Sequence, residues 1–279
     1  MKLYCLCMLS FTVLIHRFAA ADDFRIVCLA PDANEIIFDI GADKYLVGIT
    51  EECDYPPASE TIPKVGSFSF PCVESIVAKN PDVIITSGLE QSKLNKDLKK
   101  FGFKTVEIFP SDLNGMFDAY KKIGEICGME NNAEECVLRI REAVNEIKLK
   151  SSKFNYIPKI YLEIWDRPLM TVSGESFLNE IIGVSGGVNI TGQYPRAYCR
   201  INSEVIIKHD PDIIIILHGD YKDMLSREGW QNIAAVKTGY VFNDIDRDTL
   251  VRAGPRLADG LRQIYLKVKK YNDEKTSQK

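Results

Sequence analysis

The sequence contains few of the residues on which metal and redox sites depend. Its 279 residues include 3 His and 2 Trp, and none of its 8 Cys residues belongs to a CxxC pair. Zinc ribbons, His-rich sites and thioredoxin-type redox sites need such groups. We therefore predict no metal site.

Motifs typical of catalysis and nucleotide binding are also missing. The chain has no GxxxxGK[ST] or GxGxxG loop, no HExxH, and no GxSxG between an expected strand and an expected helix, where a nucleophile elbow requires it. His209 lies beside an Asp-Pro turn and His218 follows an expected strand, but no nucleophile signature accompanies them. We predict no catalytic residue and no catalytic cofactor. A binding protein is favoured, and the alternative of another class is an exported enzyme.

Long hydrophobic runs are confined to the N-terminus. Leu3–Ile15 is apolar, a short positive segment precedes it, and Ala19–Ala21 provides small residues for a cleavage site. Such a run is too short for a membrane span and is typical of a secretory signal peptide. We expect residues 1–21 to be removed near Ala21 and the protein to be periplasmic. The alternative is an uncleaved membrane anchor.

Charge of one sign is not concentrated anywhere in the chain. The 35 Lys+Arg and 39 Asp+Glu residues give a formal net charge of −4 at pH 7, without a long block of like charge. Nucleic acid is therefore not an expected partner. Export permits disulfide bonds, and the pairing of the cysteines beyond the signal peptide stays open. These cysteines are Cys28, Cys53, Cys72, Cys127, Cys136 and Cys199.

Short apolar runs alternate with amphipathic segments through most of the chain. The expected strands are 25–30, 45–50, 83–86, 105–109, 160–164, 169–172, 213–217 and 240–243. The expected helices are 33–40, 73–79, 91–101, 112–127, 176–184, 203–208, 222–235 and 255–271. This alternation predicts parallel sheets covered by helices on both faces.

The segment 131–153 differs from the rest because nothing strand-like interrupts it. Its apolar residues recur at steps of three and four, as in an amphipathic helix. They are Ala133, Val137, Ile140, Val144 and Ile147. We expect a single long helix that connects two α/β halves.

An internal repeat supports two similar halves. Residues 74–85 read ESIVAKNPDVII and residues 204–215 read EVIIKHDPDIII, and an earlier NEII at 34–37 recurs at 179–182. Generic helix–turn–strand junctions are the alternative explanation, because Asn-Pro and Asp-Pro favour turns. We predict an α/β protein with two Rossmann-like lobes joined by a single long α-helix. The expected parts are a lobe at 22–130, the connecting helix at 131–156, a lobe at 157–271 and a polar tail at 272–279.

Aromatic residues gather in the loops that follow the expected strands, where open α/β folds bind ligands. The candidates are Pro31, Tyr55, Phe68, Phe70, Trp165, Met170, Tyr194, Tyr198, Asp248 and Arg252. A set rich in aromatics and poor in charge suits a large, flat, amide-bearing ligand. Each aromatic taken alone is more often explained by packing, but together, on loops of both lobes, they favour a binding site.

Glu74 and Glu204 occupy matching places in the repeat, in the first turn of a helix. A carboxylate there complements the helix dipole. Matching positions on two lobes could also engage two arginines of a symmetric partner. The sequence leaves capping and docking equally open.

Several segments resemble the cobalamin-binding periplasmic proteins of ABC importers. They are RIVCLAP at 25–31 with Asn34-Glu35, VGIT at 47–50, DYPP at 54–57, KVG at 64–66, LEIW at 162–165, PLMT at 168–171, GGVNI at 186–190 and RAGPRL at 252–257. The resemblance covers about residues 24–268. It implies the class III, helical-backbone type of periplasmic binding protein.

The resemblance also implies roles for individual residues. Phe68 and Tyr198 stand where the family places aromatic rings against the corrin, although tryptophan is common there. Pro31 lies on the ligand loop, and Asp248 and Arg252 match residues that meet the corrin amides. Glu74 and Glu204 match acids that pair with arginines of the permease, which favours docking over capping.

We therefore expect a monomer that holds cobalamin or a related corrinoid between its lobes and delivers it to a membrane permease. Siderophore and haem carriers of the same fold are the alternatives. A ferric siderophore requires cationic side chains, for which Arg252 and Arg196 are the candidates, and haem iron requires an axial ligand such as Tyr55 or Tyr198.

Overall fold

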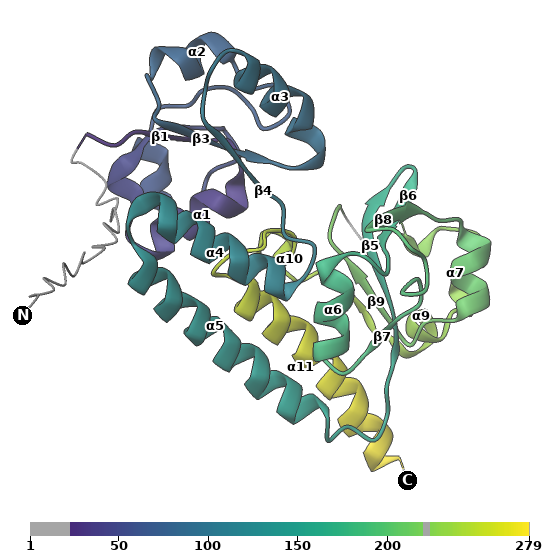
Figure 1. The fold of residues 1–279 in the computed structure, drawn as a ribbon. Coiled ribbons are helices and arrows are strands. Elements are labelled where there is room, and N and C mark those ends of the chain that lie inside the picture. The colour runs from purple at the N-terminus through teal and green to yellow at the C-terminus, as the bar shows by residue number, and fades with distance from the viewer. Residues whose placement is uncertain (1–22, 220–223, 279) are drawn as a thin grey trace, which may run out of the picture.

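The computed structural model describes residues 23–219 and 224–278, which form two α/β lobes and the helices that join them (Figure 1). The predicted signal peptide, residues 1–21, lies outside the described residues. No helix in the described part of the chain is long and apolar enough to span a membrane.

The N-terminal lobe is built on a four-stranded parallel sheet in the order β2-β1-β3-β4. Its strands are β1 (Ile26–Cys28), β2 (Leu46–Ile49), β3 (Val83–Ser87) and β4 (Thr105–Ile108). Its helices are α1 (Pro31–Asp39), α2 (Val73–Ala78), α3 (Ser92–Lys100) and α4 (Leu113–Cys127). Every residue of β1 and β3 is buried, as is typical of parallel strands covered on both faces.

The C-terminal lobe contains a six-stranded mixed sheet in the order β10-β9-β5-β6-β8, with β7 paired to β5. Its strands are β5 (Lys159–Asp166), β6 (Leu169–Val172), β7 (Val188–Asn189), β8 (Tyr198–Arg200), β9 (Ile213–Ile216) and β10 (Val241–Phe242). β6 runs antiparallel to both β5 and β8, so the prediction of a parallel sheet is wrong here. Only residues 167–168 separate β5 from β6, too few for the crossover that parallel strands require.

The helices of this lobe depart from the prediction at one place. They are α6 (Phe177–Val184), α7 (Ser203–His209), α9 (Ala234–Thr238) and α10 (Arg247–Val251). The prediction of one continuous helix over 222–235 is wrong, because among the described residues 224–225 and 234–235 are α-helical but 226–233 are not. Gly229 adopts a φ of 82°, a left-handed conformation that interrupts a helix, and the short turn Trp230–Asn232 precedes α9.

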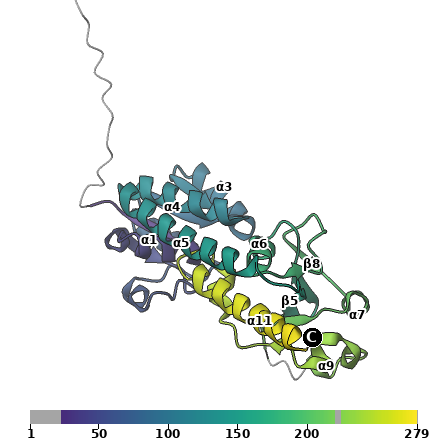
Figure 2. The same cartoon turned by 90° about the horizontal axis from the view of Figure 1, so that it is seen from below.

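Two long helices run side by side along one side of the molecule (Figures 1 and 2). α5 (Glu130–Ser151) takes the place of the expected connecting helix and buries the predicted apolar stripe. α11 (Leu257–Ser277) packs along it. The prediction of a polar tail from 272 is therefore wrong, because the helix continues and Asn272 is buried, donating to the Tyr156 carbonyl at 2.5 Å.

The internal repeat makes the same contacts in both lobes. The Asp82 carboxylate accepts the backbone N–H of Arg25 at 2.8 Å, just before β1. The Asp212 carboxylate accepts the backbone N–H of Lys159 at 2.8 Å, at the start of β5. Each Asp-Pro-Asp or Asn-Pro-Asp turn thus ties the start of one strand to its neighbour, which gives the sequence repeat a structural reason.

Candidate functional site

Three predicted ligand contacts of the C-terminal lobe come together on β5, β6 and β8. Trp165 lies opposite Met170 in the β5–β6 pair. Met170 lies opposite Arg200 in the β6–β8 pair, and Tyr198 is two residues from Arg200 on the same face of β8. We call Trp165, Met170 and Tyr198 the C-lobe wall. Trp165 and Tyr198 are 49% and 37% exposed, so their rings are available for contact.

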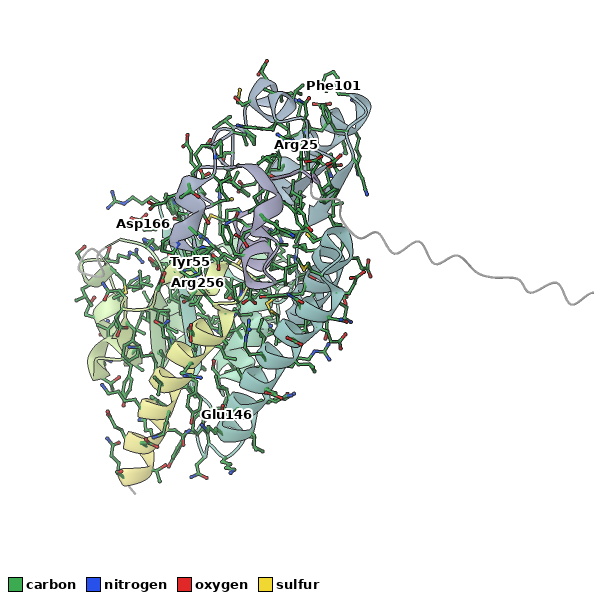
Figure 3. All side chains as sticks on the ribbon, turned by 90° about the vertical axis from the view of Figure 1, so that its left-hand side faces the viewer. Arg25, Tyr55, Phe101, Glu146, Asp166 and Arg256 are labelled. Atoms are coloured by element: carbon green, nitrogen blue, oxygen red, sulfur yellow. The ribbon has the colours of Figure 1, made fainter. Side chains whose placement is uncertain are left out.

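The predicted contacts of the N-terminal lobe follow β1 and β2. Pro31 is the first residue of α1, and Tyr55 lies in the loop after β2, where the Arg256 guanidinium stands 4.0 Å from its ring centre (Figure 3). The Gln91 side-chain amide donates to the carbonyls of Phe68 and Leu29 at 2.9 and 3.0 Å. This amide holds the Phe68 loop against the end of β1. Phe70 is 83% exposed, and its backbone N–H donates to the Ser67 hydroxyl at 3.2 Å.

An ion network joins the two predicted polar contacts to the N-terminal lobe. Arg252 binds Asp54 at 2.6 Å, Asp248 at 2.8 Å and Glu35 at 3.2 Å. Arg256 binds the same buried Glu35 carboxylate at 2.6 and 3.0 Å. The Arg252 guanidinium is thus shared by three carboxylates from different segments. These ion pairs connect the α10 segment to α1 and to the loop after β2. The Arg252 guanidinium is therefore not left free to donate hydrogen bonds to a ligand.

A second buried carboxylate lies behind the C-lobe wall. Glu163, fully buried in β5, accepts two hydrogen bonds from Arg227 at 2.7 and 2.8 Å. It also accepts one from the Tyr161 hydroxyl at 3.0 Å and contacts His218 Nε2 at 2.9 Å. The His218 ring centre lies 6.3 Å from that of Trp165. A buried carboxylate needs such partners, and they position β5 and Trp165.

Sequence reasoning did not assign Glu35, Glu163, Arg227 and Arg256. A signal was present: Glu163 is a single acid within an apolar strand, and a buried acid predicts a cationic partner. Nothing in the sequence identifies that partner, because Arg227 is 64 residues away along the chain.

Asp32, next to Pro31, provides a pH-dependent group near the site. Its carboxylate accepts the Ala33 N–H at 2.9 Å, and burial raises its pKa to about 6. Because this pKa exceeds the ordinary aspartate value of 3.8, the folded protein holds the proton over a pH range in which the unfolded chain has lost it. Stability should therefore fall as pH rises from about 4 to about 6, and change little through this group above that.

We predict that Asp32→Asn removes this decline. At pH 7 the variant should be more stable than the parent by roughly 2 kcal/mol, because the burial penalty of the carboxylate is gone. Urea unfolding between pH 4 and pH 7 measures the effect. Asp118→Asn is the control, since that side chain is 76% exposed. If the stability of Asp32→Asn changed with pH in parallel with that of the parent, Asp32 would not be the group that causes the decline.

The two predicted docking acids are both exposed, in the first turns of α2 and α7. Glu74 has its pKa lowered by its own backbone N–H and by the Cys72 thiol at 3.5 Å. In α7 the capping role belongs to Asn202, whose Oδ1 accepts the Val205 N–H at 2.9 Å. The N-cap hydrogen bond of α7 is thus made by Asn202 and not by Glu204.

The described residues contain no group of three or more His, Cys, Asp or Glu side chains arranged to hold a metal ion. The six cysteines of the described part are free thiols, and Cys72 is the exposed one among them. The candidate site thus consists of the C-lobe wall and the ring-bearing loops of the N-terminal lobe. The ion networks of Glu35 and Glu163 support it from within.

Similar sequences and similar folds occur among known proteins. The sequence profile of a family described as periplasmic binding protein matches residues 26–247. Over 250 residues the chain is 28% identical to an uncharacterized ABC transporter substrate-binding lipoprotein of Bacillus subtilis, covering 86% of this chain and 78% of that protein. It is 26% identical over 250 residues to a vitamin B12-binding protein of Vibrio vulnificus, covering 88% and 90%. A periplasmic haem-binding protein from Roseiflexus has a TM-score of 0.79 at 19% identity, covering 88% and 97%.

Proposed function

Because this chain belongs to the periplasmic binding protein family, we propose that it captures cobalamin or a related corrinoid between its lobes and delivers it to the permease of an ABC importer. The family consists of solute-binding proteins, which confirms the prediction of a binding protein and excludes the exported enzyme. Its α/β fold is the class III fold that the sequence predicted. Its partners are a small-molecule ligand and a membrane permease.

The observation that carries the corrinoid proposal is the C-lobe wall. Trp165, Met170 and Tyr198 lie on adjacent strands and offer a ring-rich surface on one lobe. Phe68, Tyr55 and Pro31 come from loops of the other lobe. A flat macrocycle buries more area against such rings than a compact anion does. The similarity to a vitamin B12-binding protein supports this ligand.

Haem is the second candidate, because one side chain near the wall has the environment of an iron ligand. The Nε2 atom of His218 is 2.9 Å from the Glu163 carboxylate, an arrangement that orients a metal-binding imidazole. Tyr198 is less suited, because burial raises the pKa of its hydroxyl and opposes the phenolate. Tyr55 carries the Arg256 guanidinium on its ring. A structural neighbour binds haem.

Calorimetric titration with cyanocobalamin, cobinamide, haem and a ferric siderophore tests the proposal. We expect one-to-one binding of the corrinoids. Tyr198→Ala should weaken cyanocobalamin binding by about tenfold or more, because the ring contributes stacking and buried area. Phe101→Ala, at an exposed ring at the end of α3, should leave it unchanged.

Each other outcome has a definite meaning. Heat from haem or the siderophore without heat from corrinoids would contradict the corrinoid proposal but keep the carrier role. Binding of cyanocobalamin that Tyr198→Ala leaves intact would show that the C-lobe wall is not the contact surface.

We further propose that residues 1–21 direct export, that the mature protein is a periplasmic monomer, and that Glu74 and Glu204 dock on the permease. The exposure of both acids supports the docking.

A further inference from the structure

Arg196 and Arg200 differ from the other arginines around the site. Arg227, Arg252 and Arg256 are each bound to at least one carboxylate at 2.8 Å or less. Arg196 and Arg200 are exposed, and neither forms an ion pair within the part of the chain that the structure describes. Two neighbouring cations without an acid leave their charge available to another molecule.

Both arginines line one hollow of about 550 Å³, which we call the β8 hollow. Its lining residues belong to β8, the edge strand of the C-terminal sheet, to the segments on either side of β8 and to the start of α7. Figure 1 shows where β8 and α7 lie. The lining residues of the hollow are Tyr194, Pro195, Arg196, Cys199, Arg200, Ile201, Asn202 and Val205. None of them is acidic, so the lining carries the charge of two guanidinium groups.

The edge strand adds backbone donors to the same place. The Ile201 N–H donates to Leu169, and the Ser173 N–H donates to Ala197. Along an antiparallel edge strand, residues whose backbone N–H binds the neighbouring strand alternate with residues whose N–H points out of the sheet edge. The N–H groups of Tyr198 and Arg200 therefore point away from β6. Arg200 and these outward amides thus occur on one short strand, and Arg196 lies two residues before it.

The β8 hollow adjoins the C-lobe wall. Arg200 lies opposite Met170 across the β6–β8 pair and two residues from Tyr198 on the same face. A macrocycle held against Met170 and Tyr198 would therefore have part of its rim beside Arg200. Groups carried on that rim could enter the hollow.

We propose that the β8 hollow binds a carboxylate or phosphate group on a side arm of the ligand. Guanidinium groups form paired, charge-assisted hydrogen bonds with such oxygens. The inference rests on the proposed function and narrows it to macrocycles that bear an anionic arm. Arg252 is already bound to Asp54, Asp248 and Glu35. The cationic contact to the anionic group of the ligand therefore comes from Arg196 and Arg200.

Matched ligands that differ in their free carboxylates test the proposal. The pairs are cobyric acid against cobinamide, which replaces its free carboxylate with an amide, and haem against haem dimethyl ester. Within the pair that binds, the parent protein should prefer the anionic member by about tenfold or more. The double variant Arg196→Gln/Arg200→Gln should bind both members with affinities within about twofold, while its affinity for the neutral member is unchanged. Lys208→Gln, an exposed cation on α7 outside the hollow, is the control.

A chemical readout identifies the residues directly. An arginine-specific dicarbonyl reagent should modify Arg196 and Arg200 in the free protein, and the anionic ligand should protect both in peptide mass spectra. Arg167, whose side chain is 84% exposed, should react equally with and without ligand.

The outcomes separate this inference from the proposed function. Equal affinity for both members of a pair, or protection by the neutral member alone, overturns the anionic subsite and keeps the carrier. Loss of uptake with unchanged ligand discrimination in the double variant also overturns it, since the arginines would then contact the permease. If no macrocycle binds, the proposed function fails. In that case ferric citrate replaces the macrocycle as the anionic probe in the modification experiment. If it does not protect Arg196 and Arg200 from the reagent, the anionic subsite is overturned as well.

Discussion

Reversing the charge at both proposed docking acids, Glu74→Lys with Glu204→Lys, should abolish uptake of the ligand while its affinity for the protein stays within about twofold of the parent. Both carboxylates are exposed, and they lie on matching helices of the two lobes. Charged groups at a docking surface set orientation and association rate, and a like-charge contact opposes the complex. Each single reversal should reduce uptake by about tenfold, since one acid remains.

The measurement is uptake of labelled ligand by cells that contain the cognate permease, with calorimetry on the same purified variants. Glu134→Lys together with Glu142→Lys is the control, because it introduces the same charge on the exposed face of α5. Glu204→Gln separates loss of charge from reversal. Loss of ligand affinity in the double variant would mean that the two acids maintain the fold. Normal uptake would place the docking surface elsewhere.

Replacing Arg227 with Ala should destabilise the protein by about 3–5 kcal/mol, because the fully buried Glu163 would lose the cation that binds both of its oxygens. Removal of one partner is expected to be more harmful than removal of the pair, since an uncompensated buried charge is the main cost. The double variant Glu163→Leu/Arg227→Ala should therefore recover part of the stability lost in Arg227→Ala.

Urea unfolding of the parent, both single variants and the double variant forms a complete cycle. Lys150→Ala is the control. Its ion pair with Glu146 is exposed on both sides, and such a pair contributes about 0.5 kcal/mol or less. A loss below about 1 kcal/mol for Arg227→Ala, or a double variant less stable than either single one, would be inconsistent with a buried charge pair at Glu163.

The fold was largely predictable because its signals are periodic and local. The stripe from Ala133 to Ile147 repeats at helical steps, and α5 buries it. The repeated Pro-Asp turns predict two similar halves, and Asp82 and Asp212 indeed tie strand starts together in both. Patterns of this kind depend on neighbours only a few residues apart, so a sequence displays them.

The errors lie where distant parts of the chain decide the structure. Helix α11 continues to Ser277 because Asn272 is buried and bonded to Tyr156, across 116 residues. The expected helix over 222–235 is interrupted at Gly229 beside the buried ring of Trp230. Strand direction in β6 follows from a two-residue connection and not from the strand's own residues.

The sequence by itself determined the α/β class, the two lobes and the helix between them, but it placed Trp165 and Tyr198 in loops, whereas both lie on strands, β5 and β8. Only the tertiary structure decided which charged side chains around the candidate site are paired with each other. It paired Arg252 with Asp54, Asp248 and Glu35, enclosed Glu163 with Arg227, and left Arg196 and Arg200 without an acid among the described residues. The physical reason is that ion pairing depends on atoms a few ångströms apart in space, and here those partners lie up to 217 residues apart in the chain.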